Sequence, residues 1–81
     1  MTEQELQEII FAELKKVAPE SDPAGIDPTE NLREALDIDS YSFQRLLVGF
    51  SDRTGVEIPE SDYAKVSTLA GMTAYLASQL L

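Results

Sequence analysis

The sequence predicts an all-α fold, a small four-helix bundle made of three main helices and one short helix, with a long first loop. Apolar residues recur every three or four positions in three segments, which is the periodicity of helices with one buried face. Proline and glycine residues separate these segments and mark the connections between them. A length of 81 residues allows one modest core, so residues 1–81 are expected to form a single domain.

Residues 3–18 are expected to form the first main helix. Thr2 stands where an N-cap belongs, and Glu5 three residues later completes the pattern of a capping box. Pro19 then ends the helix, because its ring cannot continue the hydrogen-bond ladder. The apolar stripe consists of Leu6, Ile9, Ile10, Leu14 and Val17.

Residues 19–39 form the long first loop, in which three prolines and one glycine argue against a continuous helix. A short helical turn is expected at 29–35, capped by Thr29. The seven acidic residues of the loop are interpreted as a solvated surface rather than a divalent-cation site. The spacing around Asp37 and Asp39 lacks the glycine and the terminal glutamate of a calcium-binding loop. The residues expected to hold the loop against the core are Ile26, Leu32 and Leu36.

Residues 40–54 are expected to form the second main helix, with Asp39 as its N-cap and Gly55 at its C-terminal cap. Its apolar positions repeat with helical spacing at Phe43, Leu46, Leu47 and Phe50.

An extended link follows at 56–59, because Pro59 disfavours helical backbone in the residue before it. The short helix is expected at 60–66, and Ser67 or Thr68 caps a last main helix that runs to about residue 80. The residues expected to face inward are Tyr63 and Val66 in the short helix and Leu69, Met72, Leu76 and Leu80 in the last one.

Ser40 stands where the long loop becomes a helix. With Asp39 as the cap, Ser40 falls in the first helical turn, where its hydroxyl can face solvent. A phosphate ester at this position would meet the positive end of the helix dipole, which favours anions. The plain alternative is an ordinary first-turn serine, since serine and aspartate both favour helix starts.

The composition excludes several classes of function. The net charge of −9 disfavours nucleic acid and anionic membranes as partners, because both require cationic contacts. The chain has no Cys and no His, which excludes a thiolate nucleophile, a Cys/His zinc site and a Ser-His-Asp triad. Ser40 has no His or Lys in obvious sequence reach to act as a base, so no enzyme activity is expected. The acidic N-terminus and the lack of a long apolar run make the cytoplasm the expected compartment.

From Leu32 onward the sequence resembles the acyl carrier and peptidyl carrier proteins. The matching residues are Asp39-Ser40-Tyr41, Leu46, Phe50, Ile58-Pro59, the run from Lys65 to Leu69, and Tyr75-Leu76. The resemblance implies an acidic four-helix bundle in which a phosphopantetheinyl transferase attaches 4′-phosphopantetheine to Ser40. The thiol of this flexible arm would hold acyl or aminoacyl groups as thioesters, and would exchange them with a loading ligase and downstream transferases. A protein that visits several enzymes is expected to be a monomer.

The chain departs from this family at three single positions: Asp37 replaces a common glycine, Tyr41 a common leucine, and Tyr63 a common small residue. Tyr63 is expected either to narrow a cavity for an acyl chain or simply to pack in the core or at its rim. In fatty-acid carriers the second helix is often strongly acidic, because it docks on basic enzyme patches. Here residues 40–54 contain Arg45, Asp52 and Arg53 instead.

The surface beside the arm that partners would recognise is expected to consist of Asp39, Tyr41, Ser42, Arg45 and Val48. The alternative function is an unmodified helical module for protein interaction, anchored by Phe11, Tyr41 and Tyr63 if these rings are exposed.

The charge of −9 in so small a chain predicts that added salt or magnesium stabilises the fold, because screening relieves self-repulsion. Each kcal/mol of relieved repulsion should raise the thermal midpoint by about 4–8 °C. Thermal denaturation at a series of salt concentrations measures the effect. A midpoint that does not change would show that the charges are well spaced or paired.

Overall fold

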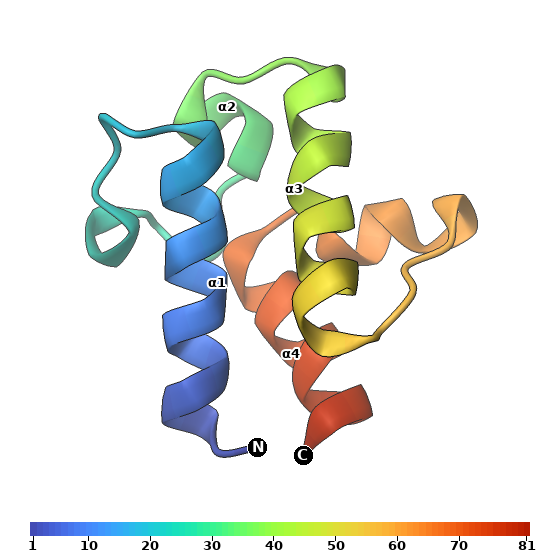
Figure 1. Ribbon diagram of the computed structural model, residues 1–81. Coiled ribbons are helices and arrows are strands. Elements are labelled where there is room, and N and C mark those ends of the chain that lie inside the picture. The colour runs from blue at the N-terminus through green and yellow to red at the C-terminus, as the bar shows by residue number, and fades with distance from the viewer.

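A computed structural model describes residues 1–81 as an all-α bundle without strands (Figure 1). In chain order its elements are α1 (Glu3–Val17), the 3₁₀ helix η1 (Pro23–Gly25), α2 (Leu32–Leu36), α3 (Ser40–Thr54), the 3₁₀ helix η2 (Glu60–Val66) and α4 (Leu69–Leu80). Helix α1 packs against both α3 and α4, and η2 packs against α4. The three main helices therefore form the bundle, and α2 lies at the end where α3 begins. No helix combines the length and apolar character needed to cross a bilayer.

The predicted caps of the main helices are confirmed. Thr2 and Glu5 form a complete capping box at the start of α1. At the start of α4, Thr68 rather than Ser67 is the N-cap, and its hydroxyl accepts a hydrogen bond from the amide of Gly71 at 3.0 Å. Gly55 ends α3 in the left-handed conformation, with φ of 76°, which glycine adopts without steric cost.

The predicted cap of the loop helix is wrong. Helix α2 begins at Leu32, and the side chain of Asn31 accepts from the amide of Glu34 at 3.2 Å. Thr29 instead donates through its amide and hydroxyl to Asp27 in a tight turn. The start is delayed because Asn31 pairs with Thr68 as an isolated β-bridge, and the amide of Leu32 donates to the carbonyl of Ser67 at 2.8 Å. This tertiary pairing keeps the chain extended up to Leu32.

The core contains thirteen buried hydrophobic residues, drawn from all four α-helices and from Val66 of η2. They are Leu6, Ile10, Leu14, Leu32, Leu36, Phe43, Leu46, Leu47, Phe50, Val66, Leu69, Met72 and Leu76. Five residues expected in the core are only partly buried and pack against its edge: Ile9, Val17, Ile26, Tyr63 and Leu80. Val17 and Leu80 are each the last residue of a helix, where the bundle no longer covers the stripe.

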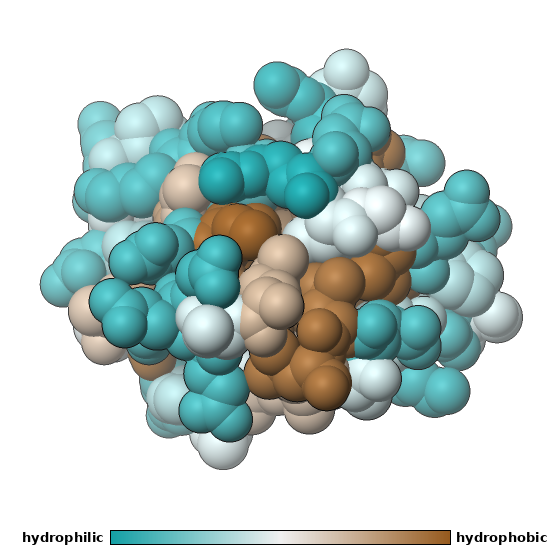
Figure 2. Space-filling view, turned by 60° about the horizontal axis from the view of Figure 1, so that its bottom comes forward, coloured by the Kyte–Doolittle hydropathy of each residue, from teal (hydrophilic) through white to brown (hydrophobic).

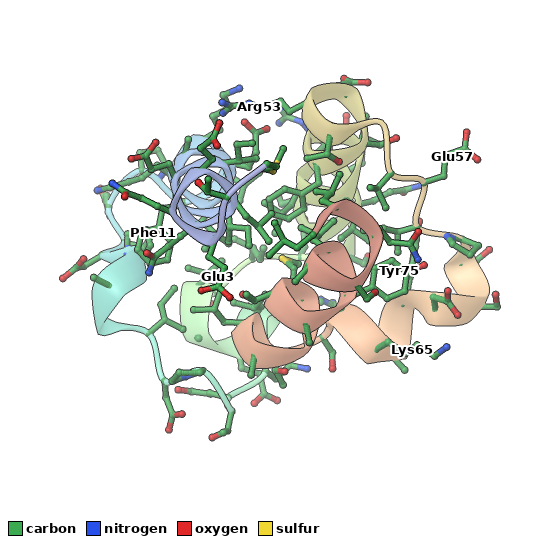
Figure 3. The ribbon with its side chains drawn as sticks, turned by 90° about the horizontal axis from the view of Figure 1, so that it is seen from below. Glu3, Phe11, Arg53, Glu57, Lys65 and Tyr75 are labelled. Carbon is green, nitrogen blue, oxygen red and sulfur yellow. The ribbon has the colours of Figure 1, made fainter.

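Polar contacts fasten η2 to α4. The hydroxyl of Tyr75, which is labelled in Figure 3, donates to Asp62 Oδ2 at 2.8 Å. Lys65 lies 3.3 Å from the other Asp62 oxygen. The hydrogen bond from Tyr75, together with Lys65, lowers the pKa of Asp62, and the same bond to Asp62 raises the pKa of Tyr75. The short helix predicted at 60–66 is present as the 3₁₀ helix η2, and these contacts hold it against α4.

Helices α1 and α3 meet around a buried carboxylate that the apolar periodicity of α1 does not reveal. Glu13 is 4% exposed, and its Oε2 lies 2.9 Å from Lys16 Nζ and 3.3 Å from Arg53. Opposite it on α3 stands Gly49, where an added Cβ would overlap Glu13 Oε1. A buried charge is tolerated only when it is paired, and here two cations from two helices pair it.

Asp37, at the position where the family that the sequence resembles often has glycine, ends α2 in the left-handed conformation with φ of 53° and ψ of 49°. It is the one non-glycine residue with positive φ. Aspartate tolerates this region better than most residues but retains the strain of its Cβ. The chain needs this turn to pass from the end of α2 to the start of α3.

We expect Asp37→Gly to stabilise the protein by about 1 kcal/mol, because relief of left-handed strain exceeds the extra backbone entropy that glycine brings to the unfolded chain. The thermal midpoint should rise by about 4–8 °C. Asp37→Ala is the matched control, since it removes the same carboxylate but keeps a Cβ. Equal midpoints for the two variants would contradict the role of the backbone conformation.

Candidate functional site

The site predicted around Ser40 lies at the first turn of α3. Asp39 has extended backbone, and its Oδ1 accepts a hydrogen bond from the amide of Ser42 at 2.8 Å. The Asp39 carboxylate thus caps the helix through the backbone amide of Ser42, and the side chain of Ser40 is exposed. Sequence periodicity located this helix start correctly, because Asp39 and the apolar stripe that follows are both local signals.

Asp39 stays ionised at neutral pH. The hydrogen bonds from Ser42, its backbone amide first, lower the pKa of the Asp39 carboxyl, and the charge of Arg33 lowers it further. The start of α3 therefore presents a fixed carboxylate followed by an exposed hydroxyl.

A shallow hollow of about 570 Å³ opens beside Ser40, between α2, the start of α3 and η2. Phe43 and Tyr63 both line it, and their rings meet edge to face with centroids 6.4 Å apart. Tyr63 is half-buried, so it packs at the rim of the core and narrows the space next to Phe43. The charged residues that line the hollow are Arg33 and Glu60.

The residues beside Ser40 suit attachment of a phosphate ester better than catalysis. An anion on the Ser40 oxygen would lie at the positive end of α3, and Arg33 lines the same hollow. The hollow holds no histidine or lysine that could serve Ser40 as a base. The structure also brings no three acidic residues together as a metal-binding group.

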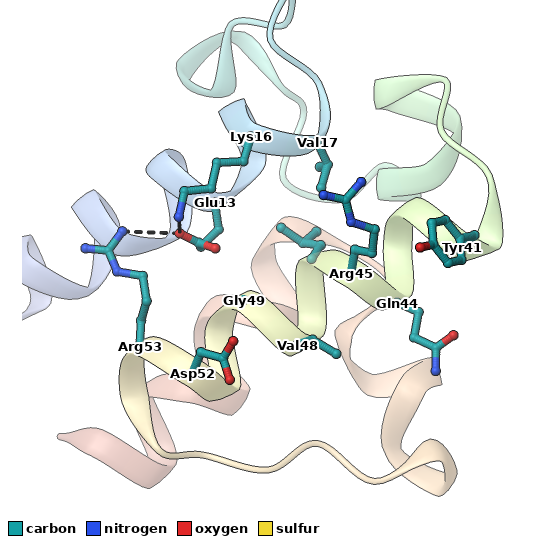
Figure 4. Close-up of a pocket in the computed structure, with 11 residues that line it drawn as sticks. Glu13, Lys16, Val17, Tyr41, Gln44, Arg45, Val48, Gly49, Asp52 and Arg53 are labelled. Carbon is teal, nitrogen blue, oxygen red and sulfur yellow. Dashed lines mark hydrogen bonds and ion pairs between the residues drawn. The ribbon is translucent and has the colours of Figure 1, made fainter.

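The residues predicted to contact partners separate into two groups. Tyr41, Arg45 and Val48 are exposed and line a groove of about 510 Å³ between α3 and the end of α1 (Figure 4). Asp39 and Ser42 lie at the start of α3, outside this groove, and Ser42 is half-buried. The groove also contains residues that the sequence analysis did not predict as contacts: Glu13, Lys16, Val17, Gln44, Leu46, Gly49, Asp52 and Arg53.

One local signal could have revealed the side of this groove that α1 forms. Glu13 and Lys16 stand three residues apart on α1, which places them on one face of the helix. The contact between Glu13 and Arg53 joins residues forty positions apart, and no local pattern predicts it.

Comparison with known proteins now decides the family. The family model described as "Phosphopantetheine attachment site" matches residues 4–76, which include the start of α3. An acyl carrier protein of Rhodococcus erythropolis is 36% identical over 75 residues, which cover 86% of this chain and 80% of the relative. The chain belongs to the acyl carrier protein family.

Two further carriers support the same assignment. A meromycolate extension acyl carrier protein of Mycolicibacterium aurum is 35% identical over 72 residues, with 86% of this chain and 74% of the relative covered. An acyl carrier protein of Myxococcus xanthus is 32% identical over 66 residues, covering 78% of this chain and 84% of the relative.

Acyl carrier proteins are non-catalytic and hold acyl thioesters on phosphopantetheine. Membership of this family implies interaction with a phosphopantetheinyl transferase and with enzymes of fatty acid synthesis. The lack of cysteine in this carrier fits the chemistry, because the thiol belongs to the attached group and not to the chain.

Asp39→Ala is expected to lower stability at neutral pH, because α3 loses the acceptor for the Ser42 amide. The pKa of Asp39 is lower in the folded chain than its ordinary value of 3.8. The contribution of its charge is therefore complete above the unfolded pKa and is lost as the pH falls through the folded pKa.

Urea denaturation at a series of pH values measures this contribution, and the difference between the wild type and Asp39→Ala should close in acid. Asp39→Asn is the control, since it caps without a charge. A difference that stays constant down to the acid limit would contradict a charged cap.

Proposed function

We propose that Ser40 carries the phosphopantetheine arm and that residues 1–81 act as one acyl carrier domain. The observation that supports this most strongly is the position of Ser40 itself. It is exposed, stands in the first turn of α3 behind a charged cap, and falls within the matched residues 4–76.

Attachment is a displacement at phosphorus. The Ser40 oxygen forms a bond to the phosphorus that bears the pantetheine of coenzyme A, and the pyrophosphate bridge to the nucleotide half breaks. The nucleotide half leaves with the bridging oxygen, and the hydroxyl proton passes to a base of the transferase. The transferase must supply that base, because the surroundings of Ser40 contain none.

The chain contributes position and charge to this step. Helix α3 holds the oxygen at the end of a rigid element, and its dipole stabilises the phosphodiester that forms. The arm then keeps the thioester tethered while it moves between enzymes, so local concentration replaces free diffusion.

We further propose that partners recognise the surface made of Asp39, Tyr41, Ser42, Arg45 and Val48, all within ten consecutive residues of α3 and its cap. These partners are the transferase, a ligase that loads the acyl group, and the transferases that receive it, with the carrier acting as a cytoplasmic monomer. The names of the relatives favour acyl over aminoacyl cargo.

The alternative, an unmodified interaction module, relies on three exposed aromatic rings. Tyr41 is 68% exposed, but Phe11 and Tyr63 are partly buried against the core. Two of the three anchors therefore lack the exposure that this function requires.

Incubation with coenzyme A and a broad-specificity phosphopantetheinyl transferase should add the mass of one phosphopantetheine, and Ser40→Ala should abolish the gain. Ser61→Ala is the matched control and should still be modified, since Ser61 is an exposed serine on η2 outside the proposed recognition surface. Intact-mass spectrometry measures both. An unmodified wild type, in a reaction that modifies a known carrier, would overturn the assignment.

A further inference from the structure

The two ends of the bundle differ in polarity. The chain termini lie at one end, and Figure 2, which brings that end forward, shows hydrophobic residues gathered on the visible face. Helix α3 begins at the other end in Figure 1, with Ser40 as its first residue. There Ser40 lines the hollow between α2 and η2, whose lining is mostly polar or charged. A charged group attached to Ser40 therefore begins at a polar end of the molecule.

Arg33 is the cation next to this serine. Arg33 in α2 and Glu60 in η2 are the charged residues that line the hollow, and neither takes part in an ion pair. Their two charges cancel, so the sign of the field at Ser40 depends on which of them acts there. Asp39 precedes Ser40 in the chain and reports this field. The charge of Arg33 lowers the pKa of the Asp39 carboxyl, whereas no acidic side chain raises it.

The backbone at the start of α3 also has unpaired donors. The Asp39 carboxylate accepts from the amide of Ser42 at 2.8 Å, and the Asp39 carbonyl accepts from the amide of Phe43 at 3.0 Å. The amides of Ser40 and Tyr41 donate to no group of the protein. Two N–H groups at the positive end of the helix therefore remain for an anion on the Ser40 oxygen.

A phosphodiester suits this set of donors. The phosphopantetheine arm begins with one, and its negative charge is shared by two free oxygens. A guanidinium presents its N–H groups as a planar fork that matches two such oxygens, whereas an ammonium acts as a point charge. The covalent bond to Ser40 fixes the anion at the start of α3. Its place therefore does not depend on the balance between Arg33 and Glu60 across the hollow.

We propose that Arg33 is a positioning residue for the arm, and that its guanidinium binds the phosphodiester on Ser40 together with the free amides of Ser40 and Tyr41. The inference rests on the proposed function, because it requires the arm to be attached at Ser40. An exposed ion pair of this kind adds little to stability. Its main effect is to hold the root of the arm on the α2 side of Ser40, away from the groove between α1 and α3.

NMR comparison of the carrier without and with the arm, the apo and holo forms, tests this contact in the wild-type chain. Each guanidinium gives one Nε–H signal in ¹⁵N-labelled protein, and the arginines are Arg33, Arg45 and Arg53. On attachment of the arm the Arg33 signal should shift and its proton should exchange with water more slowly, because the N–H donates to the phosphate. The other two signals should stay unchanged, since neither Arg45 nor Arg53 lines the hollow.

Arg33→Gln tests the energy of the contact. The arm adds a negative charge to a chain that carries −9, and this variant lacks the cation that offsets it. The substitution should lower the thermal midpoint of the holo form by about 1–8 °C more than that of the apo form, the range for one exposed ion pair.

Lys15→Gln is the matched control, because it removes one positive charge from an exposed residue of α1 outside the hollow. It should change the midpoints of the apo and holo forms equally. Both Arg33 and Lys15 are exposed, so both variants should fold, and circular dichroism verifies this.

Two results would overturn the proposal: an Arg33 signal that is the same in the apo and holo forms, or equal holo-minus-apo midpoint differences for Arg33→Gln and Lys15→Gln. Intact mass establishes that the arm is attached before either measurement. An attached arm with an unchanged Arg33 signal therefore overturns this inference alone. The absence of a mass gain overturns the proposed function, and this inference with it.

Discussion

The structure depends above all on burial of one face of α3. Phe43, Leu46, Leu47 and Phe50 are each less than 10% exposed, and burial of each such side chain is worth about 1.5–3 kcal/mol. This face fixes the rotation of α3 about its own axis. Once these four residues point into the bundle, Tyr41, Arg45 and Val48 must point out, and Ser40 must stand at the exposed end. The candidate site is thus a consequence of how the core is filled.

A second constraint sets how closely α1 approaches α3. Gly49 leaves room for the Glu13 carboxylate, and Lys16 and Arg53 neutralise it from both helices. Burying an unpaired carboxylate between helices would be costly, but Glu13 is paired with two cations. The three charges of this cluster sum to +1. The groove beside Ser40 is therefore not acidic, although the chain as a whole is. This ion cluster lines the same groove as Arg45 and Val48, two of the residues predicted to contact partners.

The carrier supplies no catalytic group, and its architecture reflects this. What the fold must provide is an exposed hydroxyl on a rigid helix end and a surface that other proteins can recognise. The long loop contributes indirectly, because the backbone pairing of Asn31 and Leu32 with Ser67 and Thr68 anchors α2 beside α4. The left-handed turn at Asp37 then directs the chain into α3. The fold tolerates backbone strain at this turn, which leads the chain to the candidate site at Ser40.

The sequence by itself determined the main helices, most of their caps, the core face of α3 and the position of Ser40. These features depend on residues within about one helical turn of each other, so periodicity and cap chemistry reveal them. Tertiary structure alone decided that Asn31 and not Thr29 caps α2, that Glu13 is buried, and that Lys16 and Val17 join α3 in one groove. Each of these outcomes depends on contacts between segments that are distant in the chain. Local sequence patterns do not reveal such contacts, because the interaction energy arises only when the segments pack together.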